Sequence, residues 1–148
     1  MPAYSLSSGL FQYDKLGGNT GNPIAAIQSV AAARFPEIEL LAEGIDWETG
    51  TPSSKLYRNA LEELNVYPHT LHAPYSTINL ASFDENERKN SVEQVASALR
   101  FLANIGGKTA IVHPTGRPSS QDMVLYTKEN IGKATENAHK SIVELVAI

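Results

Sequence analysis

The chain has 148 residues, of which 42% are hydrophobic, so it is long enough to form one ordinary domain with its own core. Its formal net charge of −4 argues against a large nucleic-acid surface, and the absence of cysteine excludes disulfides and thiolate metal sites. No apolar run reaches the roughly 18 residues of a membrane span, and the first residues lack the features of a signal peptide. We therefore expect a cytoplasmic protein with no membrane partner and no nucleic-acid partner.

Strand-like and helix-like patterns alternate along the whole chain. The helices repeat apolar residues every three or four positions, whereas the strands are short apolar or mixed runs. Pro23 stands at a first helical position, Asp84 precedes Glu87 in a near capping box, and Gly106-Gly107 ends a helix. The predicted strands cover residues 4–10, 38–42, 70–73 and 109–112, and the predicted helices begin near residues 22, 53, 84 and 127.

The two long helices have apolar stripes that predict their buried faces. In the helix that begins near residue 84, the stripe consists of Val92, Val95, Ala96, Leu99, Leu102 and Ala103. In the helix that begins near residue 127, it consists of Ile131, Ala134, Ala138, Ile142 and Leu145.

Strict alternation of strand and helix, repeating about every 30–40 residues, predicts a parallel sheet with helices outside it. Two architectures fit: an open doubly wound sheet, and half of a (β/α)₈ barrel, since a full barrel takes roughly 250 residues. No G-x-G-x-x-G fingerprint follows the first strand, and the uncapped apolar run at 143–148 favours the half-barrel. We therefore predict a single α/β domain, residues 1–148, built as a parallel (βα)₄ half of a TIM (β/α)₈ barrel.

Polar residues stand at the predicted C-terminal ends of the four strands, where barrel enzymes place their catalytic groups: Gln12, Glu43, His72 and His113. A carboxylate and two imidazoles form a partial ligand set for a divalent metal such as zinc, iron, manganese or cobalt. Because His72 and His113 follow neighbouring strands, we expect both to face one cleft. The alternative for each histidine is a polar residue at a strand mouth without a ligand, and Glu43 can instead pair with a basic neighbour.

Further candidate ligand contacts lie in the loops after these strands. Tyr75 and Asn79 either hydrogen-bond a ligand or only form turns. Trp47, the single tryptophan, either stacks on a sugar ring or packs against the next loop. Arg117 either meets a phosphate group or is a solvated loop charge.

Three motifs and two single residues between residues 71 and 116 carry a resemblance to a known family. They are His72-Ala-Pro-Tyr75, Asn79-Leu-Ala-Ser82, Arg88, Ser91 and Val112-His113-Pro-Thr-Gly116. Together they resemble the xylose-isomerase-like TIM-barrel superfamily, which includes sugar-phosphate isomerases and epimerases and the zinc-dependent AP endonucleases of family 2.

The resemblance implies roles for the two histidines. In the endonuclease branch, histidines at the positions of His72 and His113 are zinc ligands, and in the isomerase branch these positions line the sugar pocket. The isomerase branch takes its main ligands for zinc, manganese, magnesium or cobalt from strands five to eight, which this chain lacks. We accordingly expect His72 and His113 to be metal ligands of a weak or absent site, and assign Glu43, His72 and His113 as candidate catalytic residues. The candidate substrate contacts are Gln12, Trp47, Tyr75, Asn79 and Arg117.

Our functional hypothesis is the N-terminal half of a metal-dependent sugar or sugar-phosphate isomerase or epimerase, inactive as the isolated chain. In such enzymes the metal polarises a carbonyl while a base moves a proton between adjacent carbons. The alternative is a non-catalytic half-barrel that forms homo-oligomers through its open sheet edges. A fragment of an AP endonuclease-like DNA-repair enzyme is a third hypothesis, against which the acidic charge balance counts.

Overall fold

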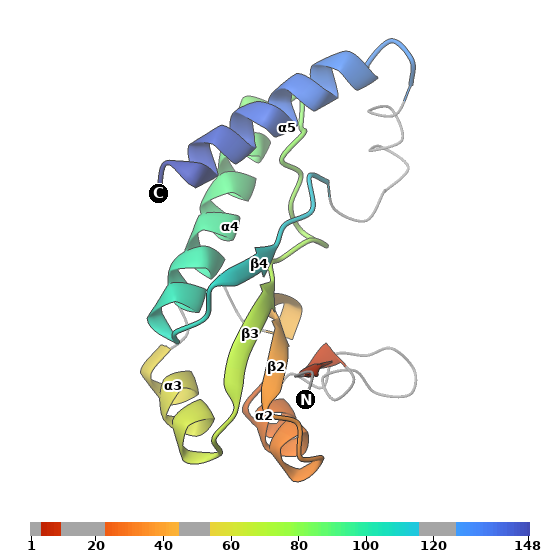
Figure 1. Cartoon of the computed structure of the whole chain (residues 1–148). Helices are drawn as coiled ribbons and strands as arrows, with labels where there is room; N and C mark the ends of the chain where they lie inside the picture. Colours follow the sequence, from red (N-terminus) through yellow and green to blue (C-terminus); the bar gives the residue numbers. More distant parts are fainter. Residues whose placement is uncertain (1–3, 10–22, 45–53, 116–126) are drawn as a thin grey trace. The chain divides into compact units, whose positions relative to one another are not determined.

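The computed structural model describes residues 4–9, 23–44, 54–115 and 127–148. In these parts four parallel strands alternate with helices, as the sequence pattern predicts (Figure 1). The elements, labelled as in Figure 1, are β1 (Ser5–Ser7), α2 (Pro23–Ala32), β2 (Glu37–Leu41), a 3₁₀ turn (Ala42–Gly44), α3 (Ser54–Glu63), β3 (Tyr67–His72), α4 (Glu85–Asn104), β4 (Thr109–Ile111) and α5 (Ile131–Val146).

The sheet has the order β1-β2-β3-β4, so that neighbours in the sequence are neighbours in the sheet. A doubly wound sheet reverses its strand order at a switch point, whereas a barrel adds each new strand to the same side. The observed order therefore matches half of a TIM barrel, and the chain has this α/β half-barrel fold.

Contacts divide the chain into two compact units, which we describe separately. The sheet unit is formed by Met1–Ala73 and Ser97–Ile111, and it contains all four strands. The helical unit is formed by Pro74–Ala96 and Val112–Ile148, and it contains α5. Helix α4 contributes its first part to the helical unit and its last part to the sheet unit. A single folding domain for residues 1–148 stays a prediction.

The core of the sheet unit lies on one face of the sheet. Alternate strand residues, including Ile38, Leu40 and Leu71, pack in one apolar cluster with residues of α2, α3 and the last part of α4. Because side chains alternate across a strand, the intervening residues point to the opposite face. Helices that cover a single face are what a barrel wall requires, since the other face lines the barrel interior.

Strand β3 begins at Tyr67, earlier than the predicted start at residue 70. The sequence pattern missed this because Pro68 lacks the backbone N–H of a regular strand residue. Ile38 pairs with Pro68, but Glu39 pairs two residues further on, so His69 is the extra residue of a bulge. Bulges are among the few places where a strand accepts proline.

Helix α4 ends as predicted, at a glycine pair. Gly106 has a φ of 89°, the left-handed conformation that glycine adopts without strain. At Gly107 a Cβ atom would lie 2.1 Å from the Cδ1 atom of Leu102 and 3.0 Å from the carbonyl oxygen of Pro68. The second glycine is therefore required by close packing.

The predicted buried stripe of α4 is partly wrong. Leu99 is only half-buried and Ala103 is exposed, whereas Ala98 and Phe101 are fully buried. The first part of the helix buries one set of positions and the last part another, because each packs within a different unit. A single stripe drawn along the whole helix therefore misplaces residues in its last part.

The predicted stripe of α5 is also partly wrong, and the helix begins later than expected, at Ile131. Ile131 and Ile142 are 47% and 39% exposed, respectively, whereas Ser141 is fully buried beside Ala134 and Leu145. The prediction that Ile142 is buried rested on its hydrophobicity alone. The hydrogen bonds of Ser141, described below, decide instead which side of the helix is buried.

Candidate functional site

Two of the candidate catalytic residues lie at the C-terminal end of the sheet. His72 is the last residue of β3 and is half-buried, and its register partners are Leu41 of β2 and Ile111 of β4. It alternates with Leu71, which belongs to the helix-side core, so it stands on the face of the sheet that the helices leave open. Glu43 is half-buried in the 3₁₀ turn that directly follows β2.

The loops that follow β3 and β4 meet within the helical unit. The ring of Tyr75 lies 5.6 Å from the imidazole of His113 between centroids, with the planes tilted by 44°. Asn79 forms an antiparallel bridge with Thr115. The structure thus brings together three residues that the sequence singled out, namely Tyr75, Asn79 and His113.

The approach of His72 to His113 stays a prediction, because the two histidines belong to different units. Gln12, Trp47 and Arg117 lie outside the described residues. Across residues 4–9, 23–44, 54–115 and 127–148, no group of three or more histidine or acidic side chains is arranged to hold a metal ion. The described donors therefore do not make a complete metal site, and we derive no step through a metal.

Sequence reasoning missed a polar cluster centred on Arg88, which lies among the described residues of the helical unit. The guanidinium is fully buried. Its Nε and Nη2 atoms donate to the two carboxylate oxygens of Glu85 at 2.8 and 2.9 Å. Nη2 and Nη1 donate to the two oxygens of Glu144 at 2.9 and 3.2 Å, and Nη1 also donates to Ser141 Oγ at 2.9 Å.

These contacts shift the pKa values of the two α4 residues, Glu85 and Arg88. The hydrogen bonds from Arg88, and next those from Lys140, hold the pKa of Glu85 well below its usual range. The hydrogen bond with Glu85 likewise raises the pKa of Arg88 above its already high ordinary value. Both groups therefore carry full charge at neutral pH.

A signal in the sequence pointed to this cluster. Arg88 lies four positions before Val92 and seven before Val95, on the predicted apolar stripe. A charged residue at such a position is buried only if it is paired, which directs attention to acidic partners. Glu85 was identifiable by its i,i+3 spacing, whereas Glu144 lies too far along the chain.

The Arg88 cluster is continuous with the loop that carries Asn79. Ser141 Oγ accepts from Arg88 and donates to the carbonyl oxygen of Leu80 at 2.7 Å. Asn137 Nδ2 donates to the carbonyl oxygen of Ser82 at 2.7 Å. This loop is therefore attached directly to α5, which crosses the first turns of α4 (Figure 1).

The same loop is also attached to α4. The backbone N–H of Asn79 donates to Ser91 Oγ at 2.8 Å, and that hydroxyl donates to the carbonyl oxygen of Glu87. Ser82 Oγ donates to the Glu87 carboxylate. Ser91 and Glu87 thus fix the two ends of the segment between Asn79 and Ser82.

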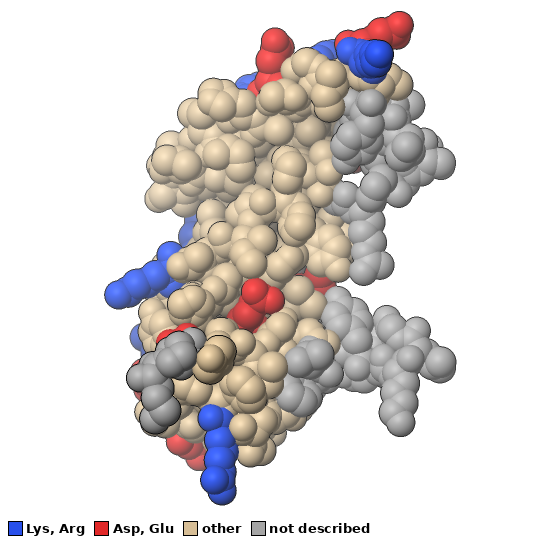
Figure 2. Space-filling view, turned by 45° about the vertical axis from the view of Figure 1, so that its right-hand side comes forward, with Lys and Arg blue, Asp and Glu red and all other residues tan. Residues whose placement is uncertain are grey.

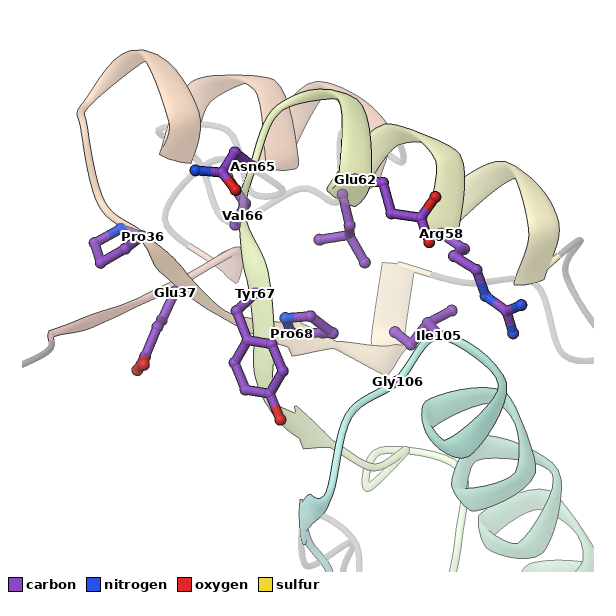
Figure 3. Close-up of a pocket in the computed structure, with 11 residues that line it drawn as sticks. Pro36, Glu37, Arg58, Glu62, Asn65, Val66, Tyr67, Pro68, Ile105 and Gly106 are labelled. Atoms are coloured by element: carbon purple, nitrogen blue, oxygen red, sulfur yellow. The ribbon is translucent and has the colours of Figure 1, made fainter.

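A pocket of about 470 Å³ lies in the sheet unit, at the other end of the strands (Figure 3). Glu37 and Tyr67, the first residues of β2 and β3, line it together with Arg58 and Glu62 of α3. In TIM barrels the N-terminal end of the strands serves stability, and catalysis takes place at the C-terminal end. We therefore place the candidate site at the end that carries Glu43 and His72, and not at this pocket.

The face drawn in Figure 2 carries basic and acidic residues, and uncharged residues make up most of the described surface between them. Of the helices in the described parts, none combines the length and the apolar character that crossing a bilayer would require.

The chain belongs to the family described as xylose isomerase-like TIM barrel, whose sequence model matches residues 27–147. This match agrees with the resemblance of the motifs around His72 and His113. It also agrees with the half-barrel strand order.

Solved structures of similar fold include several epimerases. A D-tagatose 3-epimerase-like protein is 21% identical with a TM-score of 0.74, and the match covers 99% of this chain and 48% of that one. D-allulose 3-epimerase from Methylomonas sp. is 18% identical with a TM-score of 0.65, covering 97% and 46%. The 3-keto-D-glucoside 4-epimerase from E. coli is 17% identical with a TM-score of 0.64, covering 82% and 44%.

An uncharacterised protein of Methanocaldococcus jannaschii is 27% identical over 90 residues, which is 61% of this chain and 30% of that protein. The chain therefore spans less than half of each of these proteins. The similarity to the epimerases establishes the fold, in which this chain corresponds to one half of the barrel.

Proposed function

We propose that this chain is the N-terminal half of a metal-dependent sugar or sugar-phosphate isomerase or epimerase. Family membership and the epimerase names of the similar structures support the reaction class. The observation that carries the proposal is the contact between the loops after β3 and β4, where Tyr75 meets His113 and Asn79 pairs with Thr115. Barrel enzymes act at this end of their strands.

The side chains divide into two roles. Glu43, His72 and His113 carry groups that accept or donate a proton, which is the step that isomerisation and epimerisation require. Tyr75 and Asn79 carry hydroxyl and amide groups that hydrogen-bond sugar hydroxyls. We propose the same contact role for Gln12 and Trp47, and phosphate binding for Arg117.

The proposed metal dependence requires ligands beyond those that the described residues bring together. A bound divalent metal would supply electrophilic polarisation of a sugar carbonyl. His72 and His113 offer two imidazoles, and three or more protein ligands are usual for a catalytic zinc site. We therefore expect the isolated chain to be inactive.

A titration followed by NMR tests the sugar site. We expect D-allulose to shift the signals of His113 and Tyr75 at millimolar concentrations, and His113→Gln to weaken this binding at least fivefold. His139→Gln, which changes an exposed histidine of α5, is the matched control. A sugar that shifts neither signal at 100 mM would refute the proposal.

Calorimetry with zinc and manganese tests the metal. We expect dissociation constants weaker than micromolar for a chain shown to be monomeric. Micromolar or tighter binding that His72→Ala abolishes would contradict the two-ligand assignment.

Self-association is a second candidate property, favoured by the edge strand β4. Thr109 and Ile111 are exposed, and Ile111 lies in register with His72 on the face that the helices leave open. Among the described strands, β1 and β4 each have one unpaired edge. Unpaired edges are templates for pairing, so two copies placed edge to edge would give eight strands.

Light scattering on a size-exclusion column tests this candidate property. We expect a dimer that Ile111→Glu dissociates, whereas Ile142→Glu, at an exposed isoleucine of α5, leaves it intact. A well-folded monomer at high micromolar concentration would exclude obligate pairing.

A further inference from the structure

The candidate residues that meet within the helical unit are carried by loops, yet one of these loops is attached to α4 and α5 by buried hydrogen bonds. Between Asn79 and Ser82, the loop is connected to the buried guanidinium of Arg88 through Ser141. We propose that Arg88 is a positioning residue of the site, which holds the loop after β3 so that Tyr75 and Asn79 stay against His113 and Thr115. The inference rests on the proposed function only in treating these loop residues as sugar contacts.

The contacts of Arg88 determine the orientation of α5. A guanidinium is planar and donates in fixed directions, so two carboxylates and a hydroxyl around it define one arrangement. Arg88 reaches Glu144 and Ser141, which are three positions apart on α5. These contacts fix the rotation of α5 about its axis, with Ser141 buried and Ile142 partly exposed.

Ser141 connects α5 to the loop. The hydroxyl of Ser141 accepts a hydrogen bond from Arg88 and gives its own proton to the carbonyl oxygen of Leu80. Leu80 is fully buried, so its carbonyl oxygen cannot bind solvent in place of the Ser141 hydroxyl. The backbone of the residue next to Asn79 is therefore placed by a donor that Arg88 orients.

A second attachment of the loop is made by α4 itself. Arg88 is followed one helical turn later by Ser91, whose hydroxyl accepts from the N–H of Asn79. The side chain of Asn79 in turn accepts from the N–H of Ala81. The contact from Ser141, which Arg88 orients, and the contact from Ser91 therefore meet on the loop within the segment from Asn79 to Ala81.

An alternative role for a buried arginine is stability alone, but energetics favour a positioning role. A buried ion pair is often no more stabilising than well-packed apolar residues of similar volume, because desolvating the charges is costly. A polar cluster in which every group has a hydrogen-bond partner instead favours one arrangement of the helices and loops over alternative arrangements. In this cluster, as in the rest of the described chain, no buried side-chain nitrogen or oxygen lacks a partner.

The imidazole signal of His113 reports the arrangement directly. Tyr75 lies 5.6 Å from that ring, so its ring current shifts the His113 proton signals in NMR. A Tyr75→Leu variant supplies the reference position of the signal without the tyrosine. The measurement uses the whole chain and needs no sugar, metal or activity.

We expect Ser141→Ala and Arg88→Lys to move the His113 signal at least half of the way to its position in Tyr75→Leu. Ser141→Ala removes only the connecting hydroxyl, and Arg88→Lys keeps the charge without the planar fork. Thr135→Ala and Arg100→Lys are the matched controls, since both change exposed residues, and neither should move the signal.

The outcomes separate the two proposals. A folded Ser141→Ala chain whose His113 signal stays at the wild-type position would overturn the positioning role, even if its melting temperature falls. If Arg88→Lys does not fold, Ser141→Ala alone decides. A signal that moves as expected, in a chain whose wild type does not bind D-allulose, supports positioning and refutes the proposed function. If sugar binds, Ser141→Ala should weaken D-allulose binding at least threefold.

Discussion

The two units of the molecule differ in the chemical kind of their largest fully buried side chain. Among the described residues, the largest fully buried side chain of the sheet unit is Phe101, and that of the helical unit is Arg88. Phe101 packs within an apolar cluster, whereas Arg88 lies among hydrogen-bonding partners. Apolar cores tolerate swaps that conserve volume, but a buried polar cluster requires each of its partners. The sheet unit therefore has the character of a general scaffold, and the helical unit specifies one arrangement.

The largest expected effect is the loss of the apolar core. Phe101→Ala should lower the free energy of unfolding by about 4 kcal/mol, because it removes a buried ring and leaves a cavity. It also removes the edge-to-face contact with Tyr57, whose ring centroid lies 4.9 Å away. Urea unfolding measures the change. Leu56→Ala, at a residue that is 56% exposed, is the control and should cost less than about 1 kcal/mol.

The next largest expected effect is the loss of the buried polar cluster of the helical unit. Arg88→Ala should cost about 3 kcal/mol, since it removes every hydrogen bond of the guanidinium and leaves a cavity. Arg88→Met, which fills the volume, should cost less, because Glu85 and Glu144 are partly exposed and can be hydrated by solvent. Lys89→Ala, whose exposed Nζ lies 4.0 Å from Glu85, should change stability by less than about 0.5 kcal/mol. Equal costs for Arg88→Ala and Lys89→Ala would contradict this account.

The comparison also explains what the sequence could predict. The strand and helix order and the half-barrel were predictable, because hydrophobic periodicity reports the burial that dominates the sheet unit. The start of β3 was missed because Pro68 argues against a regular strand, and the sequence pattern does not indicate the bulge at His69. The buried face of α4 was partly missed because the two parts of this helix pack within different units. That of α5 was partly missed because Ser141 is buried through contacts 53 and 61 positions away in sequence.

The candidate site was predictable in part for a related reason. Strand ends share one edge of a parallel sheet, so the positions of Glu43 and His72 at the strand ends followed from strand order alone. The meeting of Tyr75 with His113 depends on the paths of two loops, which no periodicity encodes. Motif similarity selected these residues as candidates, but it did not predict the contact between them.

A further effect concerns the stability of the sheet unit at alkaline pH, where a buried tyrosine ionises. Burial raises the pKa of Tyr57 to about 12 from its ordinary value of 10.0. A raised pKa in the folded state means that the neutral phenol is favoured, so this stability is complete below pH 10 and is lost as the pH rises towards 12. We expect a loss of about 2 kcal/mol over this interval that Tyr57→Phe removes. Tyr67→Phe, at an exposed tyrosine, is the control, and an equal effect of both variants would contradict the assignment.

A smaller effect concerns the first turn of α4 in the helical unit. Asp84 Oδ1 accepts from the backbone N–H groups of Asn86 and Glu87 at 2.7 and 3.2 Å. Asp84→Ala should therefore cost about 1 kcal/mol, as expected for the loss of a helix cap. Asp84→Asn keeps the acceptor oxygen and should recover most of that cost. If thermal unfolding shows equal losses for both variants, the contribution is charge and not capping.

The smallest effect tests whether the helical unit depends on ionisation in the way its polar burial implies. The pKa of Glu85 lies well below its ordinary value of 4.5, chiefly because Arg88 and next Lys140 donate hydrogen bonds to its carboxylate. The stability that this ionised carboxylate contributes is present above pH 4.5 and is lost as the pH falls from there towards the lowered pKa. Because the carboxylate is 48% exposed, solvent and salt screen the interaction, and the change at pH 7 should be small. We expect Glu85→Gln to flatten the fall in urea midpoint below pH 4.5, and 1 M salt to reduce the difference between variant and wild type. A variant whose midpoint falls as steeply as that of the wild type would show that the ion pair does not set the acid response of the helical unit.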